Sequence, residues 1–328
     1  MIDLLLFFPG KSVHLMARKV LFLLIILFWT KIYSFGSDPE IPDLSFRRIS
    51  PTGGFTYGAI NSIGEDSKGF IWFGTTHGLY RYNSLDVQKF INNPLDSTTI
   101  PSNSIRAIFC DNSGSLWVGT SHGICIYDNR KDHFITKVFQ DASGEFLGNN
   151  IQDIFQGDGS NILLLSSTML GRYNIESKQF ETIFTDNSLQ ENFISAAYDT
   201  KGRIYIGGSN GTIWLYEPSN QQIRVLCKHR SESISKIFPD DSGVWIGYDW
   251  AGLDLIGMQG NLIAHFGSSQ SDLNKINHNR VRDIYKDESG RIWVSTYKGI
   301  SIIDNGKIIN LLPQEISGLP YSSIQDIP

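Results

Sequence analysis

The stretch Ser104–Tyr127, SIRAIFCDNSGSLWVGTSHGICIY, decides the fold because its pattern recurs along the chain. It opens with a short β-branched and aromatic run, Ile105–Cys110, which stops at the turn Asp111–Gly114. In such a turn, Asp accepts hydrogen bonds from nearby backbone and Gly supplies positive φ. Leu116–Thr120 then returns as a second apolar run, so this half of the stretch predicts a β-hairpin.

The rest of the stretch predicts two further strands. Ser121-His122-Gly123 forms a second turn, after which Ile124–Tyr127 and Phe134–Phe139 again have strand composition. Four strands joined by tight turns make an antiparallel meander. These strands are apolar at successive positions, so both faces of the sheet need cover from neighbouring sheets.

The same pattern occurs six times, at Asn61–Tyr82, Ser104–Tyr127, Asn150–Tyr173, Phe193–Tyr216, Ser233–Ile256 and Asn279–Ile303. The large apolar residue after the hairpin turn falls at Trp72, Trp117, Leu163, Tyr205, Trp245 and Trp293, at intervals of 40 to 48 residues. This period is typical of β-propeller blades with four strands each. The sequence therefore predicts an all-β propeller with six complete blades, whose recurring tryptophans belong to the core.

Composition agrees with this fold and excludes some functions. The 328 residues include 31 glycines and carry a net charge of −5, without a basic stripe. An acidic chain of this kind does not hold a phosphate backbone, so we expect no nucleic acid as partner. Cys110 and Cys125 fall on the first and third strands of one predicted blade, so we expect buried thiols and no bridge between them.

The amino terminus has the three regions of a secretory signal peptide. Basic Met16–Lys19 precedes the apolar run Val20–Trp29, and Ser34 and Gly36 suit cleavage before Ser37. The apolar run is short for a transmembrane anchor, which is the weaker alternative. We therefore expect a signal peptide within residues 1–36, with translation beginning at Met16, and a periplasmic mature chain.

Both ends of the repeat array predict a further, incomplete blade. We assign residues 37–60 to a leader with the closing strand Leu44–Ile49, residues 61–321 to the six blades, and residues 322–328 to the first strand of a seventh. Propellers hide exposed sheet edges by pairing a strand from one terminus with strands from the other.

The repeat resembles the two-component regulator propeller repeat. Its residues in the first copy are Asp66, Gly69, Trp72, Gly74, Thr75, Gly78, Leu79 and Tyr82-Asn83, and in the second Asp111, Gly114, Trp117, Gly119, Thr120, Gly123, Ile124 and Tyr127-Asp128. Two copies depart from the pattern: Ile162–Leu165 replaces the aromatic strand in the third, and Tyr248–Gly252 makes an irregular loop in the fifth.

Proteins with this repeat are mostly hybrid two-component sensors of glycan-degrading bacteria. The resemblance implies that this chain is the first periplasmic propeller of such a sensor. It also implies a neighbouring propeller and β-sandwich, a homodimeric full-length protein anchored in the inner membrane, and an oligosaccharide ligand. The histidine kinase activity of that family belongs to domains with no counterpart in these repeats.

No residue pattern points to catalysis, a metal or a cofactor. His77 and His122 occupy equivalent turns and have no Ser or Cys partner at a recognisable spacing. The Asp residues of the D-x-x-G turns are explained by turn chemistry, and a calcium loop would need several oxygen ligands in one loop. We expect no catalytic residue, no metal site and no cofactor.

The turns between second and third strands are better candidates for ligand binding. In the fifth and sixth copies they read Tyr248-Asp249-Trp250 and Tyr297-Lys298, which place rings and charges on adjacent blades. With His77 and His122, these are the candidate ligand-binding residues. The alternative for Trp250 is packing on its own blade.

Two functions from different classes follow. One is a non-catalytic exported sensor that recognises an oligosaccharide and controls carbohydrate use. The other is a secreted propeller enzyme similar to streptogramin lyases or sialidases, which would be expected to gather His, Glu, Tyr or Arg on one face.

Overall fold

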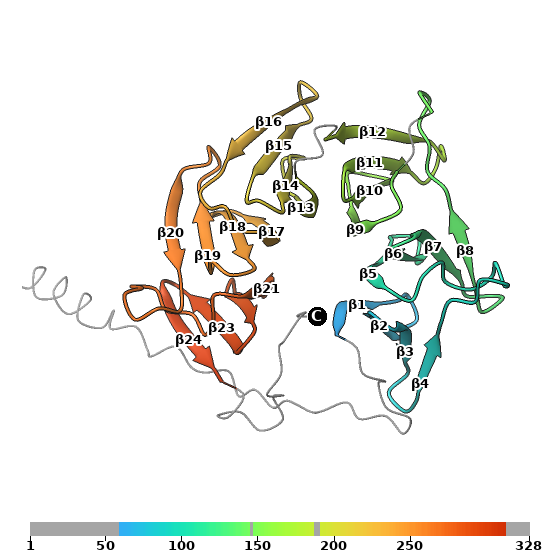
Figure 1. Cartoon of the computed structure of the whole chain (residues 1–328), viewed down its shortest axis with the longest axis horizontal. Helices are drawn as coiled ribbons and strands as arrows, with labels where there is room; N and C mark the ends of the chain where they lie inside the picture. Colours follow the sequence, from blue (N-terminus) through green and yellow to red (C-terminus); the bar gives the residue numbers. More distant parts are fainter. Residues whose placement is uncertain (1–58, 145–146, 187–190, 313–328) are drawn as a thin grey trace, which may run out of the picture. The chain divides into compact units, whose positions relative to one another are not determined.

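The computed structural model describes residues 59–144, 147–186 and 191–312. Across these ranges the chain forms six four-stranded antiparallel sheets and no helix, which confirms the predicted all-β propeller (Figure 1). No helix in these ranges is long and apolar enough to span a membrane. The predicted signal peptide, the closing strand Leu44–Ile49 and the seventh-blade strand 322–328 lie outside the described residues.

The blades follow one another along the chain. Blade one holds β1 (Ile60–Glu65), β2 (Ile71–Thr75), β3 (Gly78–Tyr82) and β4 (Val87–Phe90). Blade two holds β5 (Ile105–Cys110), β6 (Leu116–Thr120), β7 (Gly123–Asp128) and β8 (His133–Lys137). Blade three holds β9 (Ile151–Gln156), β10 (Asn161–Ser166), β11 (Met169–Asn174) and β12 (Phe180–Thr185).

The second half of the array repeats this order. Blade four holds β13 (Phe193–Tyr198), β14 (Ile204–Gly208), β15 (Ile213–Glu217) and β16 (Gln222–Cys227). Blade five holds β17 (Ile234–Asp240), β18 (Gly243–Tyr248), β19 (Leu253–Ile256) and β20 (Leu262–Phe266). Blade six holds β21 (Val281–Lys286), β22 (Ile292–Thr296), β23 (Gly299–Asp304) and β24 (Lys307–Leu311).

The predicted strands of the deciding stretch are confirmed, with shifts of one or two residues at the ends of the third and fourth strands. β5 and β6 have the predicted bounds, whereas the fourth strand runs from His133 to Lys137 and ends before Phe139. Phe139 is nevertheless buried, because its ring packs against Trp117. Cys110 on β5 and Cys125 on β7 are free thiols separated by β6, and burial raises the pKa of both.

The core lies between blades. Each hydrophobic cluster in the described chain joins two consecutive blades; one, for example, joins Trp72 and Leu79 of blade one to Ile105 and Val118 of blade two. A blade therefore buries its apolar faces only against its neighbours, as expected for a repeat architecture.

Strand glycines make this close packing possible. A Cβ added at Gly74 would lie 2.6 Å from Ile105 Cγ2, and one at Gly119 would lie 2.6 Å from Ile151 Cγ2. Gly207 stands in the same way against Ile234, and Gly247 against Val281. In the Gly-Thr pair that ends the second strand (Gly74-Thr75, Gly119-Thr120), the glycine is thus required because the first strand of the next blade leaves no space for a Cβ.

The recurring tryptophans are core residues in three of four cases. Trp72, Trp117 and Trp245 are buried, as predicted, while Trp293 is only partly buried and carries the Arg291 guanidinium over its ring. Each of the other three rings packs into a cluster shared with the following blade, whereas Trp293 belongs to blade six, the last blade in the described part of the chain.

Candidate functional site

The hairpin turns between first and second strands are structural. Gly69, Gly114, Gly202 and Gly290 all have φ between +81° and +84°, as the D-x-x-G pattern predicts. The Asp also has a second role that the sequence did not reveal. Asp111 Oδ1 accepts the backbone N–H groups of Ser113 and Ser115, and its Oδ2 accepts the indole N–H of Trp117 at 2.8 Å.

The same indole bond joins Asp66 to Trp72 at 2.7 Å and Asp287 to Trp293 at 2.8 Å. In these copies the Asp lies six residues before the Trp. Blade five has a shorter turn, with Asp240 five residues before Trp245, and Trp245 Nε1 is buried without a hydrogen-bond partner. The D-x-x-G aspartates therefore hold turns and tryptophans in place.

The turns between second and third strands lie beside the connections that join blades. The backbone N–H of Gly78 donates to Asn103, that of Gly123 to Asn149, and that of Gly252 to Asn279. In blade one, Thr75 Oγ1 donates to the Gly78 carbonyl and accepts the His77 N–H. The threonine of the G-T pair thus closes a two-residue turn.

The structure does not bring the two turn histidines to the other candidates. His77 lies in blade one, where its Nδ1 is 2.8 Å from Thr76 Oγ1, and His122 lies in blade two, where its Nδ1 is 2.9 Å from Ser121 Oγ. Both are engaged within their own turns, and neither contacts blades five and six.

In blade five the turn between second and third strands is longer and exposes one aromatic side chain. Tyr248 replaces the threonine, and three residues instead of two separate it from the turn glycine Gly252. Tyr248 itself is fully buried, so it packs beneath the loop in the core and cannot contact a ligand. Burial raises the pKa of its hydroxyl. Trp250, at the middle of the longer loop, is 56% exposed.

The close approach of Gly247 to Val281 sets this loop against the start of β21. Six side chains meet there, which we call the Arg280 cluster: Asp249, Trp250, His278, Arg280, Arg282 and Tyr297. The Arg280 guanidinium lies 5.1 Å from the Trp250 ring centroid and 5.8 Å from that of Tyr297. The His278 ring lies between the same rings, 5.9 Å from Trp250 and 5.5 Å from Tyr297.

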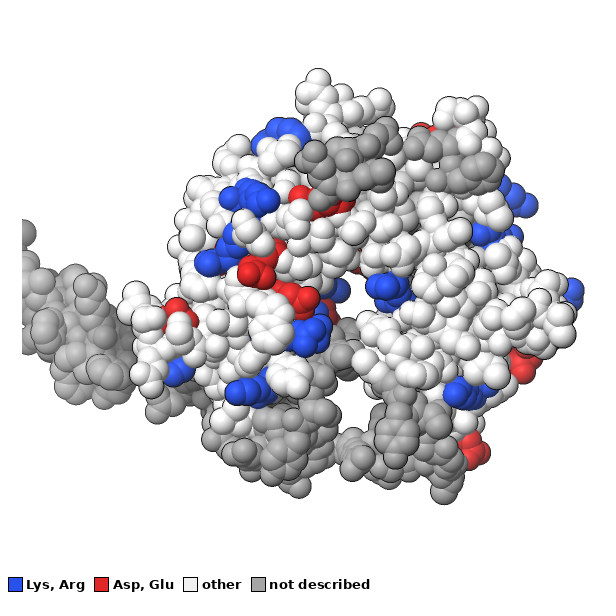
Figure 2. Space-filling view, in the orientation of Figure 1, with Lys and Arg blue, Asp and Glu red and all other residues white. Residues whose placement is uncertain are grey.

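Asp249 ties the two arginines of the cluster to blade five. Its Oδ1 lies 3.2 Å from Arg280 Nε and 3.5 Å from Arg282 Nη1. In the space-filling view, acidic and basic side chains gather beside the central opening over the blades that hold β17 to β21 (Figure 2). A stack of rings and guanidinium groups that solvent can reach is suited to binding a flat, hydroxyl-bearing ligand by stacking and charge-assisted hydrogen bonds.

Burial and neighbouring positive charges act on the basic groups of the cluster. Burial and the charges of Lys298 and Arg280 lower the pKa of His278, and burial and Arg280 lower the pKa of Arg282. His278 Nδ1 accepts the backbone N–H of Arg280 at 2.9 Å, so the proton of the neutral ring is on Nε2. The neutral ring therefore keeps a donor at the edge of the cluster.

The sequence predicted part of this cluster. Asp249, Trp250 and Tyr297 come together as expected, and Lys298 follows Tyr297 in the same turn. Arg280, Arg282 and His278 were not predicted. The sequence did carry a signal for Arg280. This residue directly precedes β21, and the start of β21 lies beside the loop of the preceding blade.

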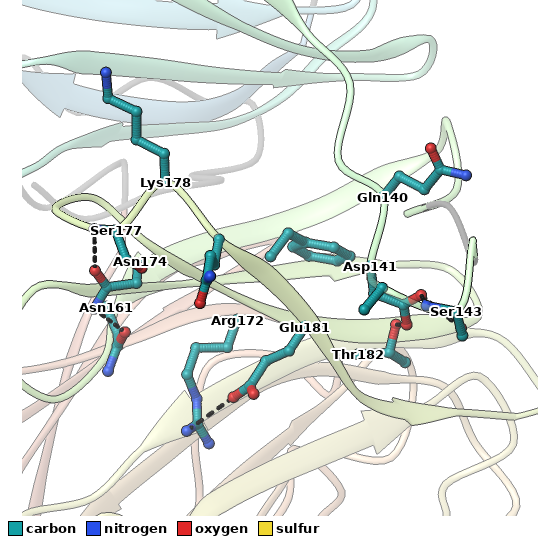
Figure 3. A pocket seen from close by; sticks show the side chains of 13 residues that line it. Gln140, Asp141, Ser143, Asn161, Arg172, Asn174, Ser177, Lys178, Glu181 and Thr182 are labelled. Carbon is teal, nitrogen blue, oxygen red and sulfur yellow. Dashed lines mark hydrogen bonds and ion pairs between the residues drawn. The ribbon is translucent and has the colours of Figure 1, made fainter.

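A hollow of about 800 Å³ lies along the outer strands of blade three (Figure 3). Its polar groups pair with one another: Arg172 lies 3.1 Å from Glu181, and Thr182 Oγ1 donates to Asp141 at 2.6 Å. Phe180, its aromatic lining residue, is buried. This hollow lacks the exposed rings of the Arg280 cluster and is the weaker candidate.

Comparisons with known proteins agree with the repeat. A family model described as two component regulator propeller matches residues 54–77, 99–122 and 275–298, in the same register of blades one, two and six. No curated protein matches this chain.

Solved structures share the fold at low identity. The extracellular domain of a putative hybrid two component system from B. thetaiotaomicron has a TM-score of 0.64 at 17% identity, over 76% of this chain and 34% of that one. The extracellular domain of a putative one component system from the same organism has a TM-score of 0.50 at 18% identity, over 80% of this chain and 42% of that one.

A surface component of the type-IX secretion system of Porphyromonas gingivalis has a TM-score of 0.54 at 14% identity, over 79% of this chain and 39% of that one. The present chain thus spans less than half the length of each of these proteins. At these identities the likeness concerns the fold alone. The chain is thus a β-propeller in which three stretches match the two-component regulator propeller model, and its fold is similar to that of the extracellular domain of a putative hybrid two component system.

Proposed function

We propose that this chain is the ligand-recognising propeller of an exported two-component sensor, that it performs no chemistry itself, and that an oligosaccharide binds over the Arg280 cluster. The observation that carries the proposal is the pairing of two half-exposed rings on adjacent blades, Trp250 at 56% and Tyr297 at 45%, with polar groups between them. Sugar rings present C–H faces that stack on aromatic rings and hydroxyls that pair with charged groups.

The family match supports the signalling role. Other propellers and a β-sandwich of a longer protein are the expected neighbours, with a periplasmic location and membrane anchoring of the full-length sensor. Binding at a junction between two blades would alter their packing, which is a means of passing a signal to such neighbours. Control of carbohydrate use is the cellular role that we propose for the complete sensor.

The test is calorimetric titration of the chain with oligosaccharide fractions. Trp250→Ala should lower the affinity about fivefold or more, because an aromatic contact contributes about 1 kcal/mol, and should leave Tm unchanged because the ring is exposed. Tyr285→Ala is the matched control: this ring on β21 is 40% exposed and lies at the opposite end of the strand from the cluster. Equal losses in the two variants, or no binding by the parent chain, would reject the proposal.

A further inference from the structure

The charges of the Arg280 cluster are unbalanced. Arg280 and Arg282 both direct their ion pairs to one oxygen, Asp249 Oδ1. Lys298 stands close enough for its charge to lower the pKa of His278. Within the described residues the cluster therefore holds more positive than negative charge, although the chain as a whole has a net charge of −5.

Arg282 also has an unused donor. Its Nε is buried and has no hydrogen-bond partner among the described residues. Leaving a buried charged donor unpaired costs about 1–3 kcal/mol or more, so a structural ion pair alone would be a poor use of this guanidinium. Arginine pairs best in a two-pronged geometry that uses Nε together with one Nη, and planar carboxylates and sulfates match that geometry.

A structural arginine in the same chain shows the contrast. The Arg81 guanidinium also lies among aromatic rings, 5.5 Å from Trp72 and 5.6 Å from Tyr127. Those rings are buried between blades one and two. Arg280 instead lies between two rings that solvent reaches, so the contrast is in the exposure of the rings: Trp250 is 56% and Tyr297 45% exposed.

We infer that the ligand of the Arg280 cluster is an acidic oligosaccharide, whose carboxylate or sulfate group pairs with Arg280 and Arg282 while a sugar ring stacks on Trp250 or Tyr297. The anion gives Arg282 a partner of its own when this side chain turns toward it, while Asp249 remains paired with Arg280. This inference rests on the proposed function and adds the charge of the ligand.

The experiment uses the full chain and one digest of mixed plant and animal polysaccharides, separated by anion exchange into neutral and acidic oligosaccharide pools. We expect the acidic pool to bind, with an affinity that falls as salt is raised. Reduction of its carboxyl groups or removal of its sulfates should abolish binding in one of the two arms and so identify the anionic group.

Arg280→Gln and Arg282→Gln should each lower the affinity for the acidic pool tenfold or more. Arg280→Lys keeps the charge without the planar fork and should recover part of the affinity. Arg224→Gln is the matched control, because Arg224 is exposed on β16 and away from the cluster. Measuring Tm of each variant separates a loss of binding from a loss of folding. Arg280→Gln is the safer variant in this respect, because Arg280 is the more exposed of the two arginines.

Three outcomes would overturn the inference. Binding of the neutral pool that depends on Trp250 but not on the arginines would leave the proposed function standing and remove the charge requirement. An equal loss of affinity in Arg224→Gln would show that the acidic pool is held by unspecific electrostatic attraction. Binding by neither pool would overturn the proposed function and this inference with it.

Discussion

At the scale of single residues, the hydrogen bond from a repeat Trp to a turn Asp affects how much each tryptophan contributes to the stability of the fold. Trp117 and Trp245 occupy the same register and are both buried. Trp117 Nε1 donates to Asp111, whereas Trp245 Nε1 has no partner. The two sites therefore allow the hydrogen bond to be separated from the packing of the ring.

We expect Trp117→Phe to destabilise the fold by about 1–3 kcal/mol more than Trp245→Phe, because the former leaves the buried carboxylate of Asp111 without its indole donor, and the latter removes an unpaired donor. Urea denaturation of both variants measures the difference. Equal losses would show that the indole bond adds nothing to ring packing.

The turn aspartate of blade six, Asp287, should also make stability depend on pH. Burial alone would raise the pKa of Asp287, but hydrogen bonds from Trp293 and Arg291 outweigh it and hold the pKa below its usual value. A lowered pKa in the folded state contributes stability above the unfolded value of about 3.9, and this stability is lost as pH falls through the folded pKa.

The gap in urea midpoint between the parent chain and Asp287→Asn should therefore be wide at pH 7 and should narrow as the pH falls below about 4. Asp241→Asn, in the blade-five turn, is the control with an exposed carboxylate. A gap that is independent of pH would assign the effect to packing instead of ionisation.

At the scale of elements, the contact between a strand glycine and the next blade limits what each blade tolerates. Gly119 is not in the left-handed region, so its requirement is space and not backbone freedom. A Cβ there would lie 2.6 Å from Ile151 Cγ2 and 3.2 Å from Ala107 Cβ.

Gly119→Ala should accordingly cost about 1–3 kcal/mol, the range for overpacking a core. Ile151→Ala removes the clashing methyl, so the double variant should be more stable than the sum of the single changes predicts. Gly148→Ala should be nearly neutral, since its nearest neighbour would be at 3.4 Å. Strict additivity in thermal unfolding would contradict the proposed contact.

At the scale of the whole molecule, the described blades form a linear series of interfaces, each with its own hydrophobic cluster. In such arrays, stability is the sum of unit and nearest-neighbour terms. Damage at one interface should therefore remain local before it becomes global.

Hydrogen exchange of Gly119→Ala should show this directly. Protection should fall first for amides of blades two and three and last for those of blades five and six. A uniform fall across all blades would instead indicate that the propeller unfolds as one cooperative unit.

The sequence by itself determined the strands, the turns and the six complete blades of the described chain. Its signals are local: a glycine with positive φ at the D-x-x-G turn, a β-branched run before it and a regular spacing of large apolar residues act within one blade. β5 and β6 could therefore be predicted to the residue, and the fourth strand nearly so. Trp250 and Tyr297 could be named because their turns occupy equivalent places in successive copies.

Only the tertiary structure decided what lies between blades. Gly119 reads as a strand residue until Ile151 is seen against it. Asp249 reads as a charge free to meet a ligand until Arg280 and Arg282 are found paired with it. These partners belong to different repeats, and no local propensity records which side chains of one blade will face the next. The burial of Tyr248 follows from the same cause, because its cover comes from packing across blades four and five.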